Sequence, residues 1–158
     1  MRGKSGSREQ RKVVRAKAGD GLSGYFFIDL CLDKLQFWVN HSFDVGSQGL
    51  PDPLKYMTLT VERARGAGED ADKLTCALTL NLFKGVKNPP FRLTVSMRAV
   101  YAIKGNPSLQ PDEFLKFNAP AHIYSFMREL IFNITARGNT PPLLLPPLNF
   151  EKLLEGED

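Results

Sequence analysis

Cysteine and histidine are scarce in this chain of 158 residues, which carries two of each. Cys31 and Cys76 form no CxxC pair for zinc and cannot supply a disulfide framework. Both lie in apolar runs, which predicts buried free thiols in a reducing compartment. His41 and His122 have no companion cluster, and no HExxH motif, GxSxG motif or phosphate-binding glycine loop is present. We therefore predict a protein that is not an enzyme and uses no cofactor or metal. A nucleophile made of Cys31 or Cys76 with His122 as base is the alternative.

Long apolar runs are also missing. No segment approaches the roughly 18 uninterrupted apolar residues that a membrane-spanning helix needs. The longest early run, Tyr25–Leu32, is short and contains Asp29, and the N-terminal region lacks the apolar core of a signal peptide. These features predict a cytoplasmic protein without membrane insertion.

The basic charge of the chain is unevenly distributed. Residues 1–20 hold seven of the 21 basic side chains but two of the 17 acidic ones, so the remainder is nearly neutral. This pattern predicts a disordered basic N-terminal arm over residues 1–21 and one folded domain over residues 22–158. A nucleic-acid-binding module that uses the arm is an alternative function. The remainder has no run of basic residues interleaved with aromatic ones to support it.

Alternating apolar and polar residues predict four strands before residue 100. In the third, five apolar side chains alternate without a break from Leu74 to Leu82. A seven-residue turn, Lys84–Pro90, then leads to a second alternating run that starts at Phe91 and predicts an antiparallel hairpin. A change of phase in the first strand predicts a β-bulge near Asp33–Lys34. The predicted strands lie within residues 26–41, 54–63, 74–82 and 91–98.

The apolar period becomes helical after Gly105. Pro111–Asn118 predicts a short helix, and a longer helix follows from near Pro120, with Asn118 as its cap. Its stripe consists of Ile123, Phe126, Met127, Leu130, Ile131 and Ile134. Arg137 suits its carbonyl end, and Gly138 suits a left-handed cap. A last short helix is expected at Asn149–Leu154. The fold class is therefore α+β: a four-stranded antiparallel β-meander with two to three helices packed on one face.

An unusual loop, Thr140–Phe150, follows the long helix. Its four prolines exclude a helix or a central strand. One interpretation is a loop that folds back to complete the core. The other is the wall of an apolar groove that binds partners. Its apolar side chains are Leu143, Leu144, Leu145, Leu148 and Phe150.

The segment Tyr124–Leu154 resembles the SecB family of protein-export chaperones. It has an aromatic residue and then Arg-Glu in the long helix, Arg-Gly at the helix end, a proline-containing apolar loop, and Asn-Phe before the last helix. The matching residues are Tyr124, Arg128, Glu129, Arg137, Gly138, Pro141, Pro142, Leu145, Pro147, Asn149 and Phe150. With the strands upstream, the resemblance covers residues 22–154.

The resemblance implies an ATP-independent holdase that binds unfolded client proteins or preproteins, without catalytic residues. It also implies a homotetramer built as a dimer of dimers. Apolar grooves would bind the clients by area and shape, since extended apolar segments need no particular sequence for that. The implied client-binding residues are Met57, Leu59, Val61, Leu143, Leu145, Leu148 and Phe150.

The chain departs from the family on the outer face of the sheet. Proteobacterial members resembling the best-known type present carboxylates there to SecA. Lys34, Trp38 and Thr94 stand at those positions here, and Arg92 stands where an apolar contact is expected. Protein export, with SecA as a candidate partner, is the favoured role. The alternative is a SecB-like chaperone of a toxin–antitoxin system, with a labile antitoxin as its partner.

Overall fold

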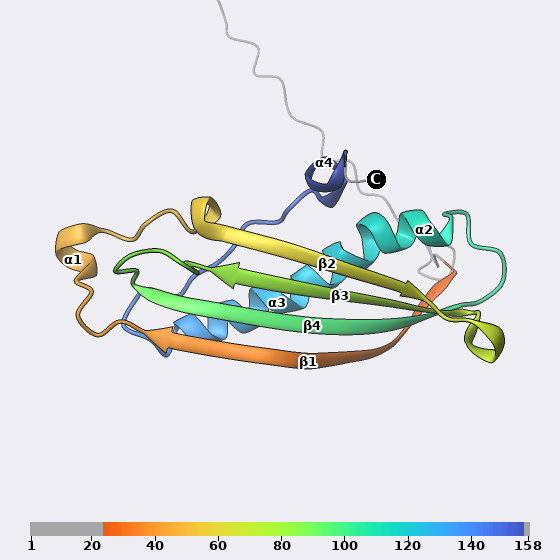
Figure 1. Ribbon diagram of the computed structural model, residues 1–158, viewed down its shortest axis with the longest axis horizontal. Coiled ribbons are helices and arrows are strands. Elements are labelled where there is room, and N and C mark those ends of the chain that lie inside the picture. Colours follow the sequence, from red (N-terminus) through yellow and green to blue (C-terminus); the bar gives the residue numbers. More distant parts are fainter. Residues whose placement is uncertain (1–23, 157–158) are drawn as a thin grey trace, which may run out of the picture.

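A four-stranded antiparallel sheet forms one layer of the molecule, and helices form the other. The computed structural model describes residues 24–156, so the predicted basic arm of residues 1–21 lies outside the described part. The strand order is β1-β4-β3-β2, and all the pairs are antiparallel (Figure 1). The predicted fold class is confirmed. The elements are β1 (Tyr25–Val39), α1 (Val45–Gln48), a 3₁₀ turn (Pro53–Tyr56), β2 (Met57–Arg65), a 3₁₀ turn (Gly68–Asp70), β3 (Lys73–Leu82), β4 (Phe91–Ile103), α2 (Pro111–Glu113), a π-helical turn (Phe114–Asn118), α3 (Ala119–Thr135) and α4 (Phe150–Leu154).

The hairpin of β3 and β4 forms the centre of the sheet. The alternating residues of β3 from Leu74 to Leu82 all point to the helical side and are fully buried. Every second residue of β4 from Leu93 to Ala99 points the same way and is also buried. Since burying a large apolar side chain stabilises the fold by about 1.5–3 kcal/mol, this double row contributes strongly to stability.

The position of β1 differs from a simple meander. β2, β3 and β4 follow one another in the sheet as predicted, but β1 lies beside β4 instead of β2. Its 15 residues match the 13 residues of β4, whereas β2 has nine. The connection through α1 and the 3₁₀ turn therefore crosses from one edge of the sheet to the other.

A β-bulge interrupts β1 where the sequence predicts one. The register with β4 shifts between Leu32 and Lys34, which leaves Asp33 as the extra residue. The Asp33 carboxylate accepts a hydrogen bond from Arg98 Nη2 at 2.9 Å. The bulge keeps the apolar residues on both sides of it facing the helical layer, because the side chains of a regular strand alternate. A second shift, between Phe27 and Asp29, was not predicted.

The predicted break at Asn118 is wrong, because the chain stays helical from Pro111 to Thr135. Asn118 has helical backbone angles and its side chain caps nothing. The π-helical turn Phe114–Asn118 joins α2 to α3, and the Ala119 N–H donates to the Phe114 carbonyl five residues earlier. This wider turn accommodates Pro120, which has no N–H to donate.

The predicted left-handed cap at Gly138 is also wrong. Gly138 is absent from the glycines with positive φ in the described chain. A Cβ atom there would lie 3.2 Å from Phe37 Cζ of β1, so a larger residue fits only if the Phe37 ring shifts. Arg137 Nη1 does donate to a carbonyl of the last helical turn, that of Asn133, as expected of a base at this end.

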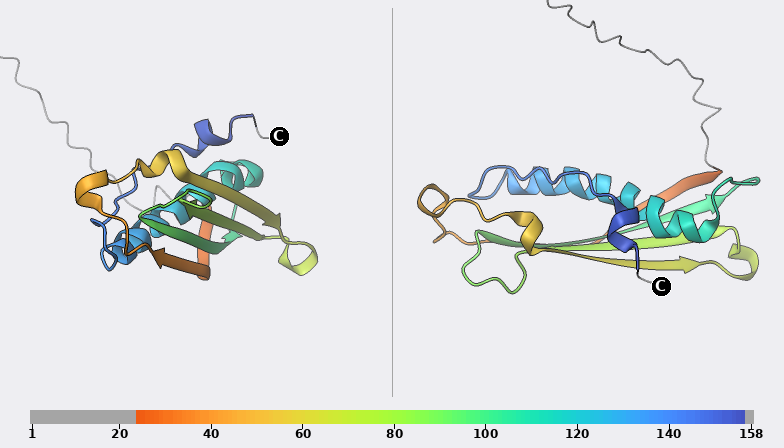
Figure 2. Two further views of the ribbon diagram at one scale, coloured as in Figure 1. Left: turned by 60° about the vertical axis from the view of Figure 1, so that its left-hand side comes forward. Right: turned by 90° about the horizontal axis from the view of Figure 1, so that it is seen from above.

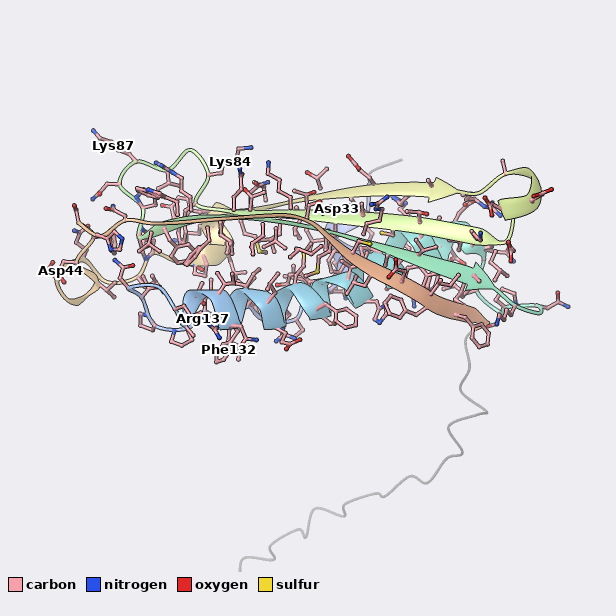
Figure 3. The ribbon with its side chains drawn as sticks, turned by 90° about the horizontal axis from the view of Figure 1, so that it is seen from below. Asp33, Asp44, Lys84, Lys87, Phe132 and Arg137 are labelled. Carbon is pink, nitrogen blue, oxygen red and sulfur yellow. The ribbon has the colours of Figure 1, made fainter. Side chains whose placement is uncertain are left out.

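The helical layer covers the middle of the sheet and leaves its outer face open. α3 packs on β3 and β4, while the neighbouring strands form the margins (Figure 2). Figure 3 shows Lys84 and Lys87 on the side of the sheet away from α3, whereas Phe132 points away from the sheet on the helical side. The margin beside β2 and the outer face of the sheet are therefore left uncovered by α3.

Candidate binding surfaces

An apolar trough runs between β2 and α4. It has a volume of about 640 Å³. β2 contributes inward-facing side chains that α3 does not cover, and the end of the proline-rich loop contributes Leu148. We call this surface the β2–α4 trough. Its lining consists of Leu54, Met57, Leu59, Thr60, Val61, Leu148, Phe150, Leu153 and Leu154.

Two hydrogen bonds and one aromatic contact fix α4 and the loop before it. Asn149 Oδ1 caps α4 by accepting from the Lys152 N–H at 3.2 Å. The rings of Tyr124 and Phe150 meet edge to face, with centroids 5.8 Å apart. The Tyr124 hydroxyl donates to the Pro146 carbonyl at 2.9 Å. One wall of the trough is thus held directly by α3.

Two further side chains of α3 satisfy the backbone of the proline-rich loop. The Thr135 hydroxyl accepts from the Leu143 N–H at 2.8 Å and donates to the Ile131 carbonyl at 2.7 Å. Arg128 Nε donates to the Leu145 carbonyl at 2.6 Å. A loop with four prolines offers few N–H donors of its own, so these contacts replace a regular backbone ladder.

The structure separates the predicted client-binding residues into two groups. Five of them line the trough: Met57, Leu59, Val61, Leu148 and Phe150. Leu143 and Leu145 do not, since they are 8% and 0% exposed and complete the core beneath α3. Both interpretations of the loop therefore apply, each to a different part of it.

Sequence reasoning missed four lining residues of the trough: Leu54, Thr60, Leu153 and Leu154. Leu54 and Leu153 lie on its rim and are about half exposed, at 44% and 48%. Leu54 falls in a 3₁₀ turn that Asp52 caps by accepting from the Leu54 N–H at 3.0 Å, so β2 begins at Met57 instead of Leu54. The Asp-Pro pair before Leu54 was the available signal for a turn at this place.

A second hollow lies on the outer face of the sheet, at the end where β4 begins. We call it the outer-face saddle. It has a volume of about 770 Å³ and brings together all four residues predicted for partner docking: Lys34, Trp38, Arg92 and Thr94. Trp38 and Arg92 are cross-strand neighbours, and the Arg92 guanidinium lies over the indole at 4.9 Å from its centroid. Lys84, which was not predicted, also lines this hollow.

The two cysteines occupy different environments. Cys76 is fully buried, and burial raises the pKa of its thiol to about 12. Cys31 is half-buried, so the prediction of two buried thiols is wrong for it. It faces outward because Leu30 and Leu32 face inward, and its hydrogen bond to Asp29 raises its pKa.

The thiol-nucleophile alternative gains no support from this geometry. A raised pKa disfavours the thiolate, which is the nucleophilic form. His122 Nδ1 instead lies 2.9 Å from the Tyr101 hydroxyl. Within residues 24–156, no group of three or more His, Cys, Asp or Glu side chains could hold a metal. No helix of that part is long and apolar enough to cross a membrane.

These features define a class of protein. It is an α+β domain with helices on one side of the sheet and an apolar trough at the sheet margin. The sequence model of the family "Preprotein translocase subunit SecB" matches residues 47–157. The chain belongs to the SecB family.

Curated relatives agree with this assignment. A protein-export protein SecB of Anaplasma phagocytophilum is 27% identical over 130 residues, which cover 80% of this chain and 77% of the relative. A protein-export protein SecB of Halorhodospira halophila is 27% identical over 93 residues, which cover 59% of this chain and 53% of that relative. The chain thus spans about half the length of the second relative.

A solved structure shares the fold. The SecB-like chaperone of Mycobacterium tuberculosis, in complex with a peptide from the HigA1 antitoxin, superimposes with a TM-score of 0.56 at 14% identity. The match covers 78% of this chain and 87% of that one.

Proposed function

We propose that this protein is an ATP-independent holdase that binds unfolded polypeptides in the β2–α4 trough. The observation that carries the proposal is the trough itself, since eight of its nine lining residues are apolar and it stays open at the margin of the sheet. Membership of a family of export chaperones supports it. Chaperones of this family are not enzymes, and we assign no catalytic residue here.

The trough suits extended clients without a fixed sequence. An extended segment points alternate side chains to one side, so every second residue can enter the trough. Burying one large apolar side chain contributes about 1.5–3 kcal/mol, which gives weak binding for a short segment. β2 is an edge strand of the described sheet, so its outer backbone groups can pair with the same client segment.

We also propose the homotetramer that the family resemblance implies. β1 forms the other edge of the sheet, and its exposed apolar side chains include Ile28, at 53%, and Leu32, at 48%. A long apolar edge strand is a template for pairing with a second copy. Several troughs on one assembly would then hold one client at several points, which raises the overall affinity. We expect Ile28→Lys to shift sedimentation toward smaller species. An unchanged sedimentation coefficient would contradict this interface.

The clients are, in this proposal, preproteins awaiting export in the cytoplasm, as the names of the curated relatives indicate. An antitoxin is the alternative client, because the structural neighbour was solved with an antitoxin peptide. SecA remains a candidate partner for export. Purification of the protein from its own cells, followed by identification of bound chains, distinguishes preproteins from an antitoxin.

Suppression of client aggregation tests the holdase. Leu54→Glu together with Leu153→Glu places two carboxylates on the rim, where both side chains are about half exposed and folding tolerates them. We expect about a tenfold loss of affinity for a denatured client, since an ionised carboxylate cannot be buried against apolar groups without cost. Thr58→Glu is the matched control, because Thr58 is exposed on the same strand and absent from the trough. Equal activity of both variants would refute the proposed site.

A further inference from the structure

The outer-face saddle concentrates positive charge. Three cationic side chains, Lys34, Lys84 and Arg92, line it, and none of its described lining residues is acidic. Asp33, at the bulge, already accepts from Arg98 at 2.9 Å. The remaining lining is made of hydroxyl and amide groups, the Trp38 indole, and the inward-facing Phe37 and Leu93 at its floor. The saddle is therefore a cationic hollow with polar donors.

Arg92 is held in place within the saddle. It stacks over Trp38 and donates from Nη2 to the Val86 carbonyl at 3.2 Å. Stacking and a backbone acceptor restrict the rotamers of the long side chain before any ligand arrives, so little entropy remains to be lost on binding. The planar guanidinium keeps further N–H groups for a carboxylate, which it can bind through two parallel hydrogen bonds.

We infer that the outer-face saddle binds an extended acidic segment of a partner polypeptide. Its carboxylates would lie on Arg92, Lys34 and Lys84, and its backbone would run over Thr94 and Ser96. Charge complementarity argues for this occupant. The inference is independent of the proposed holdase function, because the saddle and the trough lie on opposite faces of the sheet.

The charge distribution favours a peptide over a nucleic acid. A nucleic acid needs a basic track along many phosphates. On the outer face beyond the saddle, Arg98 of β4 is paired with Asp33 at the bulge of β1, and Glu62 lies on β2, across from Ala77. The charge of Arg98 is thus already offset by Asp33, and Glu62 would repel a continuing phosphate backbone, whereas a short acidic segment ends within the saddle.

Trp38 makes the inference directly measurable, because it is the only tryptophan of the chain. The full-length protein is titrated with a synthetic peptide of alternating glutamate and glycine, whose glutamates all face one side when it is extended. Quenching or a wavelength shift of Trp38 fluorescence reports binding. The peptide with glutamine in place of glutamate is the ligand control. Binding should weaken as salt is raised.

Lys34→Glu together with Lys84→Glu should weaken binding of the glutamate peptide by about tenfold or more, since two attractive pairs become repulsive. Both lysines are exposed, so the variant should fold, and circular dichroism checks this. Lys104→Glu is the matched control at the opposite end of β4 and should change the affinity by less than about twofold.

Three results would overturn the inference: no response of Trp38 to the glutamate peptide, an equal response to the glutamine peptide, or tighter binding of oligo-thymidine. An unchanged client-holding activity of the Lys34/Lys84 variant, with loss of peptide binding, separates this site from the trough.

Discussion

Replacing Thr135 by valine tests how the proline-rich loop is attached to α3. The Thr135 side chain is fully buried, and its hydroxyl both accepts from the Leu143 N–H and donates to the Ile131 carbonyl. Valine keeps the shape but leaves the buried Leu143 N–H without its partner. An unsatisfied buried donor costs about 1–3 kcal/mol, so we expect that loss in the free energy of unfolding.

Thr135→Ser is the control, because it keeps the hydroxyl and removes one methyl group. It should cost about 1 kcal/mol from the small cavity that remains. Urea denaturation followed by circular dichroism measures both variants at one fixed protein concentration, since association would also change the apparent stability. If the serine variant were the less stable of the two, the hydroxyl would not be what anchors the loop.

Three further predictions concern the core, the loop and pH. Leu78→Ala should cost about 2–5 kcal/mol in urea denaturation, because Leu78 is fully buried; a loss below about 1 kcal/mol would contradict its place in the core. Tyr124→Phe should cost about 0.5–1.5 kcal/mol by removing the hydrogen bond to Pro146, and equal midpoints would disprove that contribution. The pKa of Cys76 is raised from 9.0 to about 12, so its contribution to stability is complete below pH 9 and is lost as the pH rises toward 12. In Cys76→Ala the free energy of unfolding should fall less steeply between pH 9 and pH 12. An equally steep fall would refute this prediction.

Much of the fold could be predicted from the sequence because its signals are local. The unbroken alternation from Leu74 to Leu82 requires a strand, and the change of phase in β1 requires a bulge. The position of β1 beside β4 has no local signal, since it depends on matched strand lengths across the whole sheet. The continuous helix through Asn118 depends on a π-helical turn, whereas its sequence favours a cap.

The candidate trough was only partly predictable for a similar reason. The sequence shows that the loop is rich in leucine. It does not show which leucine side chains face the core, because an irregular loop has no repeating period. Hydrogen bonds with Thr135 and Arg128 hold the backbone of Leu143 and Leu145, whose side chains point into the core. Leu148 is left to line the trough. Lys84 lines the outer-face saddle because the β3–β4 turn places it on the side of the sheet away from α3 (Figure 3).

Site-directed cross-linking tests the central claim that clients bind in the β2–α4 trough. A benzophenone probe is attached to Leu153→Cys and, separately, to Thr58→Cys, both in a Cys31→Ser background with the buried Cys76 kept. We predict that a denatured client cross-links to the probe at position 153, on the rim of the trough, and far less to position 58 on the outer face. Equal cross-linking at both positions, or cross-linking at position 58 alone, would contradict the account.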